Sequence, residues 1–184
     1  MCSRTPRSQA GMSLIEVVVF IVVLGLALAG VMILYSQATR ASADPLVRKQ
    51  TLAIASSLLE EIELRPFTYC DPDDAKVYTA TGTGDCTSVE GIGPEPGETR
   101  DTFDNVNDYH GFSMADGNIK GADGQPVPSL AGYSVTVSVA NAGGDFVGFA
   151  ADAVLLITVT STHAGTGTTV SLQGYRFRYA PNSP

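Results

Sequence analysis

The chain has 184 residues, of which 44% are hydrophobic and 16% charged, and its formal net charge is −8 at pH 7. This length suits one modest hydrophobic core with an accessory element and argues against two large domains. The acidic balance disfavours nucleic acid as a partner, because binding phosphates requires clustered Lys and Arg. Charge is also unevenly spread: the first fifteen residues carry only Arg4 and Arg7, whereas residues 60–152 hold 17 of the 19 acids.

A long apolar segment follows the basic start. Residues 17–35 (VVVFIVVLGLALAGVMILY) contain no charge, and Glu16 alone interrupts the wider stretch 12–35. About 24 helical residues span roughly 36 Å, enough to cross a lipid bilayer. A buried helix of a soluble protein would normally keep a polar stripe. We therefore predict a transmembrane helix over residues 12–35, with the N-terminus cytoplasmic by the positive-inside rule.

A secretory signal peptide is an alternative interpretation of this start. It would need a small-residue cleavage site after the apolar run, and Ala27-Leu28-Ala29 matches one only weakly. The sequence GMSLIE at residues 11–16 instead stands before the run. Glycine has no side chain and permits close approach of a protease. A carboxylate such as Glu16 costs roughly 2.5 to 3.5 kcal/mol at the centre of a membrane helix and less near the interface, so it is normally functional.

This motif resembles the processing site of type IV prepilins and pseudopilins. The resemblance rests on Gly11, Met12, Leu14 and Glu16, although Phe is the commoner residue after the cut. It implies that a prepilin peptidase removes the leader 1–11 by cutting after Gly11 and methylates the new amine of Met12. We expect Glu16 to pair with the Met12 amine of a neighbouring subunit during assembly; the alternative is that Glu16 reaches the lipid headgroups.

Residues 36–65 predict an amphipathic extension of the helix. Asp44-Pro45 predicts either a kink or a new N-cap with proline at the first helical position. Beyond it, apolar residues recur at spacings of three and four, and we expect this face to cover a sheet. The face comprises Val47, Thr51, Ile54, Leu58 and Ile62. We expect the polar residues to meet solvent: Arg48, Lys49, Gln50, Ser57, Glu60, Glu61 and Glu63. Arg65-Pro66 predicts the end of the helix.

Residues 66–131 are rich in turn-forming residues and predict loops with short strands. Cys70 and Cys86 lie here, whereas Cys2 belongs to the leader. In an oxidising compartment the pair predicts a disulfide worth roughly 3 kcal/mol. Two sulfurs without a nearby histidine make a poor zinc site.

Two acid-rich groups in this region carry oxygens of the kind that binds calcium. One is the segment 101–108, and the other combines Asp71, Asp73 and Asp74 with Asp85. Neither follows the pattern of an EF-hand loop, so we interpret both as solvated loops and predict no metal site.

The last third predicts an antiparallel meander of three strands near residues 133–139, 155–159 and 170–179. Gly174 shifts the apolar parity between Leu172 and Tyr175, which predicts a bulge or bend. A sheet apolar on one face and threonine-rich on the other suits a helix packed across it. We therefore predict an α+β fold, with residues 66–184 as a globular domain of loops and antiparallel sheet. The resemblance to prepilins implies that this fold is type IV pilin-like.

No catalytic or cofactor motif is evident. The chain has two histidines, His110 and His163, and no nucleophile elbow or phosphate loop. We therefore predict neither enzymatic activity nor a cofactor.

Four segments further resemble the minor pilin D group of the mannose-sensitive haemagglutinin (MSHA) pilus: residues 43–50, 70–74, 103–112 and 174–181. This implies a low-abundance subunit that helps initiate or cap a type IV pilus at the inner membrane, with the C-terminal domain periplasmic before the subunit reaches the cell surface. The implied partners are the prepilin peptidase, a platform protein, an assembly ATPase, other major and minor pilins, and the lipid bilayer. A minor pseudopilin of type II secretion is the alternative, since its N-terminal half would look the same. A single-pass sensor or anchor would keep its leader.

Overall fold

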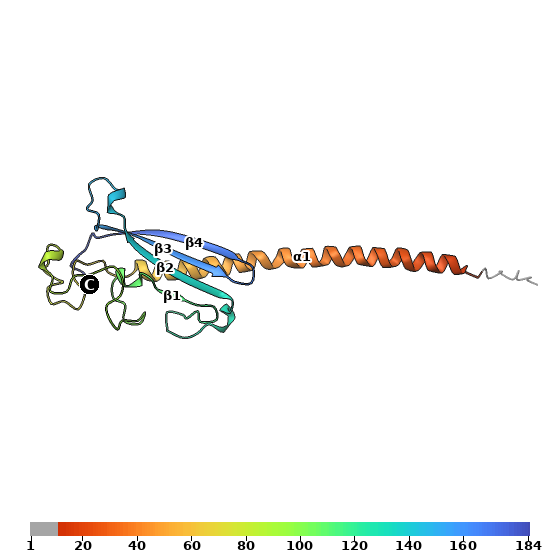
Figure 1. The fold of residues 1–184 in the computed structure, drawn as a ribbon, viewed down its shortest axis with the longest axis horizontal. Coiled ribbons are helices and arrows are strands. Elements are labelled where there is room, and N and C mark those ends of the chain that lie inside the picture. Colours follow the sequence, from red (N-terminus) through yellow and green to blue (C-terminus); the bar gives the residue numbers. More distant parts are fainter. Residues whose placement is uncertain (1–10) are drawn as a thin grey trace, which may run out of the picture. The chain divides into compact units, whose positions relative to one another are not determined.

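The computed structural model describes residues 11–184, so the predicted leader with Cys2, Arg4 and Arg7 lies outside the described residues. The main elements are α1 (Leu14–Glu63) and four strands, β1 (Ser113–Met114), β2 (Tyr133–Asn141), β3 (Val154–His163) and β4 (Thr168–Phe177) (Figure 1). Single 3₁₀ turns are η1 (Thr83–Asp85), η2 (Asn107–Tyr109), η3 (Pro128–Leu130) and η4 (Gly143–Asp145). The chain divides after Asp44 into two compact units, which are described separately.

The first unit contains the apolar part of α1. Its segment Leu14–Ala38 is 25 residues long, has a mean hydropathy of 3.2 and buries none of its most apolar window within the protein. A core helix of a soluble protein would bury such a face. This segment therefore has the length and composition of a membrane-spanning helix.

The second unit begins inside α1, at Pro45. Helical backbone runs through this proline, so the separate helix start predicted at Asp44-Pro45 is not observed as a break in α1. Proline lacks the N–H of an interior helical residue, which costs about 3 kcal/mol or more. Downstream, Leu58 and Ile62 are buried in the core. Burial contributes about 1.5 to 3 kcal/mol for each such side chain, so packing offsets the lost hydrogen bond.

The four strands form one antiparallel sheet in the order β1-β2-β3-β4. Strands β2, β3 and β4 correspond to the three predicted strands, and the α+β fold class is confirmed. The two-residue edge strand β1 lies within residues 66–131, where short strands were predicted without bounds because so short a strand shows no alternating pattern. It is defined by pairing with β2, with Ser113 opposite Thr136 and Met114 opposite Val135.

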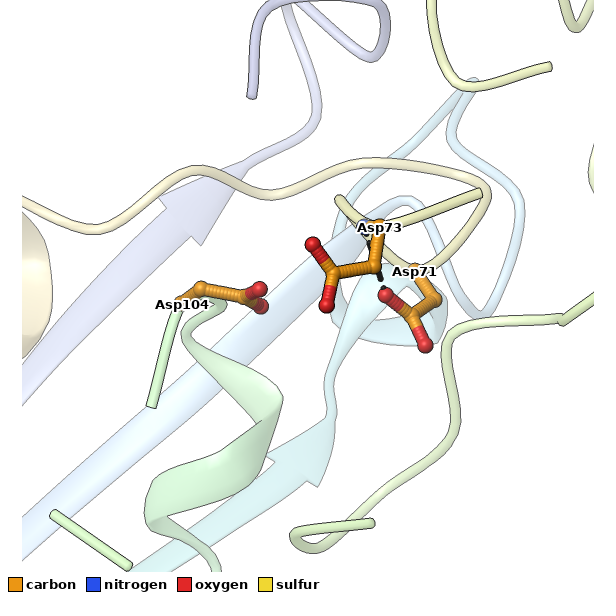
Figure 2. Close-up of side chains that lie close together, drawn as sticks. All are labelled: Asp71, Asp73 and Asp104. Atoms are coloured by element: carbon orange, nitrogen blue, oxygen red, sulfur yellow. Dashed lines mark hydrogen bonds between the residues drawn. The ribbon is translucent and has the colours of Figure 1, made fainter. Parts of the chain in front are cut away.

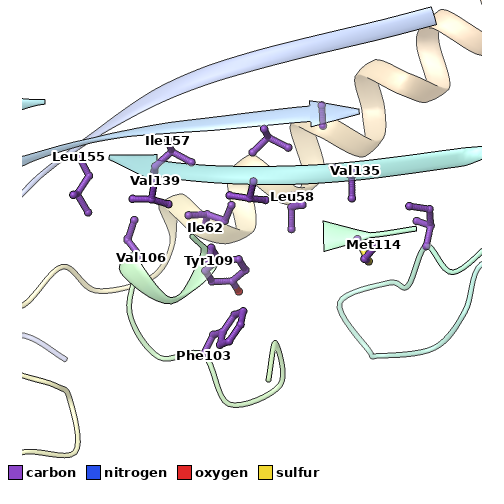
Figure 3. Close-up of a cluster of buried hydrophobic side chains, with 14 of the residues drawn as sticks. Leu58, Ile62, Phe103, Val106, Tyr109, Met114, Val135, Val139, Leu155 and Ile157 are labelled. Atoms are coloured by element: carbon purple, nitrogen blue, oxygen red, sulfur yellow. The ribbon is translucent and has the colours of Figure 1, made fainter. Parts of the chain in front are cut away.

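The hydrophobic core lies between α1, the sheet and the segment that contains η2 (Figure 3). Its buried members from α1, β2 and β3 are Ala55, Leu58, Ile62, Tyr133, Val135, Val137, Val139, Leu155, Ile157 and Val159. Phe103 and Tyr109 close the other side of this core, with ring centroids 5.0 Å apart in an edge-to-face arrangement. The helix thus covers the apolar face of the sheet as predicted.

Of the bulge or bend predicted at Gly174, the bulge is not observed. Strands β3 and β4 pair without interruption from Val154 opposite Phe177 to His163 opposite Thr168. A Cβ built on Gly174 would lie 2.1 Å from Glu63 Oε1, so the glycine allows α1 to pass close to the strand. Tyr175 consequently points to the opposite face, where its ring packs against Phe146 from the β2–β3 connection.

The prediction that Glu61 faces solvent is also wrong. Arg100 Nε and Nη2 donate to the two Glu61 carboxylate oxygens at 2.8 and 2.5 Å. The Tyr109 hydroxyl donates to Glu61 Oε1 at 2.9 Å. Both partners come from residues far along the chain, so helical periodicity alone could not reveal them. The network ties α1 to the segment that carries η2.

Candidate functional site

The residues of the predicted processing motif lie at the start of the described chain. Gly11 and Met12 are exposed and precede the first residue of α1, Leu14. A Cβ built on Gly11 would meet no atom of the protein within 4 Å, and Gly11 is not among the glycines with positive φ. The fold therefore does not require glycine at this position, and any requirement for it lies with a molecule that binds this segment.

Glu16 lies in the first turn of α1. Its backbone N–H donates to Ser13 O at 3.0 Å. A carboxylate in the first helical turn interacts favourably with the positive end of the helix dipole, by about 0.3 to 1 kcal/mol. Glu16 thus has a modest local role within its own helix, in addition to the intersubunit pairing that we predict for it.

The structure contains the predicted disulfide between Cys70 and Cys86, with an S–S distance of 2.02 Å and a Cα–Cα distance of 5.3 Å. Cys70 is fully buried and forms a bridge with Val89. At the other end of the unit's chain, Asn182 Nδ2 donates to Val77 O at 2.7 Å. The disulfide loop is therefore held from two sides.

The acidic groups suggested by the sequence are rearranged in the structure. Asp71 and Asp73 lie together with Asp104, and one oxygen from each falls within 4.8 Å of the others (Figure 2). Asp74 instead caps the disulfide loop by accepting from the backbone N–H groups of Lys76, Thr87 and Ser88. Hydrogen bonds from these amides, from Lys76 first, lower the pKa of Asp74.

Asp85 also has a local structural role. Its Oδ2 accepts from Thr81 N at 2.8 Å and from Thr81 Oγ1 at 2.7 Å. The backbone hydrogen bond from Thr81 is the main cause of its lowered pKa. Asp85 therefore does not join Asp71 and Asp73, contrary to the group suggested by the sequence.

Two further acidic triads extend from Asp104 into the protein. One comprises Glu98, Asp104 and Asp108, and the other comprises Glu90, Glu95 and Asp108. Burial, followed by the nearby charge of Asp108, raises the pKa of Glu90 to about 9 and that of Asp104 to about 6. Burial and a hydrogen bond with Glu98 raise the pKa of Glu95 to about 7. Burial also raises the pKa of Asp108.

Sequence reasoning missed Glu90, Glu95 and Glu98 as members of an acidic site. They lie between Asp85 and the acid-rich segment 101–108, in a loop whose glycines and prolines give no periodic pattern. The only available signal is the presence of three glutamates within nine residues. Long-range folding then brings them beside Asp104 and Asp108.

Comparison with protein families gives one match. A family model described as "Prokaryotic N-terminal methylation motif" matches residues 6–32, which include Gly11, Met12 and Glu16. The comparison with curated proteins and the comparison with solved structures each gave no significant match. The matched segment is short, but it ends within the apolar helix. A methylation motif of this kind therefore overlaps the start of a helix with the length and composition of a membrane span.

Proposed function

We propose that this chain is the precursor of a structural minor pilin of a type IV, MSHA-like pilus. The observation that carries the proposal is the order of three features along the chain. A methylation motif at residues 6–32 overlaps an exposed apolar helix, and a folded α+β unit follows. Such an order suits a subunit that is stored in a membrane and then transferred into a filament. Its proposed role is therefore structural and not enzymatic.

The environment of Gly11 supports processing at this position. Because the protein itself has open space around Gly11, a larger residue there would not disturb the fold. A prepilin peptidase, by contrast, needs close access to the backbone that it cuts. Cleavage after Gly11 creates the Met12 amine, which is then methylated.

The apolar half of α1 supports packing between subunits. Gly25 and Gly30 both have open space where a side chain would be. Small residues of this kind let membrane helices approach closely. In the proposed assembly, helices of major and minor pilins pack through this segment, and the platform protein and assembly ATPase drive their transfer from the bilayer.

The proposed topology is single-pass, with a cytoplasmic leader and the second unit in the periplasm. The disulfide supports this placement, because disulfides persist in oxidising compartments. The resemblance of four segments to the MSHA minor pilin D group supports the MSHA-like pilus. A minor pseudopilin of type II secretion is the second candidate, favoured by the same N-terminal match.

Intact-mass measurement of the protein, from purified filaments for the wild type and from membrane extracts for the variants, tests the proposal. We expect a mature chain that begins at Met12 and carries one methyl group on its amine. Gly11→Leu should keep the leader, whereas Gly25→Leu should be processed normally, since both glycines are surrounded by open space but only Gly11 adjoins the cut. An intact Met1 in wild-type filaments, or normal processing of Gly11→Leu, would contradict the proposal.

The choice between the two machineries needs a separate experiment. Sheared MSHA-type pili should contain the subunit in small amounts, and its deletion should reduce piliation. If deletion instead blocks secretion of type II substrates while piliation is unchanged, the pseudopilin alternative is correct.

A further inference from the structure

Glu90 is a buried acidic residue. The residue is 7% exposed, and no hydrogen-bond donor among residues 11–184 meets either carboxylate oxygen. An ionised carboxylate in such a place carries a large desolvation cost unless another charge or a proton neutralises it. The buried Glu90 carboxylate therefore requires a cation or a proton to neutralise it.

The backbone holds Glu90 in this position. Its N–H donates to Tyr69 O at 3.3 Å, and the preceding residue, Val89, pairs with Cys70. The Cys70–Cys86 disulfide joins the same two segments. Glu90 is thus placed by contacts of its own backbone and of the neighbouring disulfide; when protonated, its carboxyl can donate a hydrogen bond to Asp108.

Asp108 and Glu95 converge on the same point. Asp108 is fully buried; its Oδ2 accepts from the N–H groups of Asp104 and Asn105 at 3.0 and 2.8 Å, whereas its Oδ1 meets no basic or amide donor in the described part of the chain. One oxygen each from Glu90, Glu95 and Asp108 lies within 4.8 Å of the other two. Oxygens bound to one Ca²⁺ can lie up to about 4.6 to 5.2 Å apart, because Ca–O distances are about 2.3 to 2.6 Å.

The surroundings of this triad are strongly negative. Asp104 and Glu98 form an adjoining triad with Asp108, and Asp71 and Asp73 lie beyond Asp104. Within residues 11–184, the two ion pairs engage other carboxylates, those of Glu61 and Asp152. No basic side chain of this part of the chain therefore forms an ion pair with the triad.

We propose that Glu90, Glu95 and Asp108 form a calcium-binding site. The donors are all carboxylates, which suit hard cations, and thiol and imidazole ligands for zinc are absent from this triad. Calcium accepts irregular sets of six to eight oxygens and can complete its shell with water. This site lies in the folded second unit, so it can be tested independently of the proposed pilin function.

The alternative is that protons neutralise the triad. Burial and the neighbouring carboxylates raise the pKa of Glu90 to about 9, so without a cation Glu90 is protonated at neutral pH. A bound calcium ion would displace this proton, because ligating carboxylates must be ionised. The two arrangements therefore differ in their response to calcium and to removal of the Glu90 charge.

Calorimetric titration of the full chain in detergent with CaCl₂, and separately with MgCl₂, tests binding directly. We expect one saturable calcium site per chain with a Kd of roughly 10⁻⁶ to 10⁻⁴ M, and weaker magnesium binding. Calcium at about 100 times Kd should raise Tm by about 5 to 10 °C relative to EDTA. Absence of saturable binding up to about 10 mM calcium, weaker than typical extracellular calcium modules, would overturn the site.

Glu90→Gln and the matched control Glu60→Gln then locate the site. Both remove one carboxylate charge, but Glu60 is exposed on α1. Glu90→Gln should weaken calcium binding by about tenfold or more, whereas Glu60→Gln should leave it unchanged. Equal calcium affinity of wild type and Glu90→Gln would rule out the proposed ligands.

The thermal unfolding of Glu90→Gln at pH 8 distinguishes cation from proton. In EDTA the variant should have a higher Tm than the wild type, because it no longer carries a buried, unpaired acid. In saturating calcium it should have a lower Tm, because it loses the bound ion. A variant more stable than the wild type under both conditions would show that protons alone neutralise the triad.

Discussion

Glu61 and Glu90 are both buried or half-buried glutamates of the second unit, and their surroundings act on them in opposite directions. Burial alone raises the pKa of Glu61, but hydrogen bonds from Arg100 and Tyr109 outweigh it, so the pKa stays below its ordinary value. Glu90 has no such donors, and burial raises its pKa to about 9. The same residue type therefore stabilises the fold at one position and requires neutralisation at the other.

These differences predict how stability depends on pH in calcium-free solution. The pKa values of Glu90, Glu95 and Asp104 in the folded state are about 9, 7 and 6. Unfolded carboxyls titrate near pH 4, so between about pH 5 and 9 the folded chain binds more protons than the unfolded chain. The free energy of unfolding should therefore fall as the pH rises through this range. The lowered pKa of Glu61 affects a lower pH range. The stability that ionised Glu61 contributes is lost only as the pH falls below about 4.

Urea titrations in EDTA at a series of pH values measure this dependence. Four neighbouring carboxylates all raise the pKa of Glu90: those of Asp71, Asp104, Asp108 and Glu95. Saturating calcium should flatten the curve, since bound calcium keeps the ligands ionised. A calcium-free stability that rises between pH 5 and 9 would contradict the assigned environments.

At the residue scale, a short linear motif can be recognised from the sequence because its residues are close together in the chain. Gly11, Met12 and Glu16 belong to one short motif, and the family comparison covers the same residues. The Glu90 triad could not be predicted in this way. It depends on contacts between three loop segments, and no local spacing encodes the burial that makes Glu90 unusual.

Two glycines show how the elements of the second unit fit together. Gly143 begins η4 in the β2–β3 connection, and a Cβ there would lie 1.8 Å from the backbone oxygen of Ala150. Gly174 lies in β4 beneath α1, and a Cβ there would meet mainly the end of the Glu63 side chain. Backbone cannot move aside cheaply, whereas a flexible side chain can adopt another rotamer.

We therefore expect the two alanine variants to differ in stability. Gly143→Ala should lower the free energy of unfolding by about 1 to 3 kcal/mol, the usual cost of overpacking. Gly174→Ala should change it by less than about 1 kcal/mol, because Glu63 can shift and alanine loses less backbone entropy than glycine on folding. Chemical denaturation of both variants measures the difference. Similar losses for the two would show that the close approach at Gly143 does not restrict its side chain.

The regular elements were predictable because their patterns are long. The apolar periodicity after Pro45 and the alternation in β2, β3 and β4 each extend over several residues. The errors occur where a distant element decides the outcome. The sequence suggested a bulge at Gly174, but the glycine instead leaves room for α1, which packs against β4. Tyr175 packs against an aromatic residue of the β2–β3 connection, which its own strand pattern could not reveal.

At the scale of the whole molecule, the two units have opposite surfaces. The described part of the first unit contains the apolar segment Leu14–Ala38, whose most apolar window is not buried within the protein, whereas the second unit has its own core and an acidic composition. An exposed apolar surface of this extent needs lipid or other apolar helices around it. Membrane storage and filament packing would each satisfy this need. Within the apolar segment Leu14–Ala38, Glu16 is the one acidic residue.

The last prediction concerns the role of Glu16 in assembly. A filament needs a heterologous interface that repeats without closing, and apolar helices supply adhesion but little axial register. A carboxylate and a neighbouring Met12 amine attract strongly in a low-dielectric setting only when their depths agree. Glu16→Ala should therefore reduce incorporation into sheared pili while leaving cleavage after Gly11 and membrane insertion intact.

Immunoblots of sheared filaments against membrane-retained protein measure incorporation, and intact mass measures processing. Glu16→Gln is the matched control, since it keeps the side-chain shape and polarity in the first helical turn but removes the charge. Both variants should be depleted from filaments if charge pairing sets the register. Full incorporation of Glu16→Gln with loss of Glu16→Ala would assign Glu16 to a polar contact at the helix start. Full incorporation of both would remove the register role, because the apolar helices alone would then suffice to position the subunit.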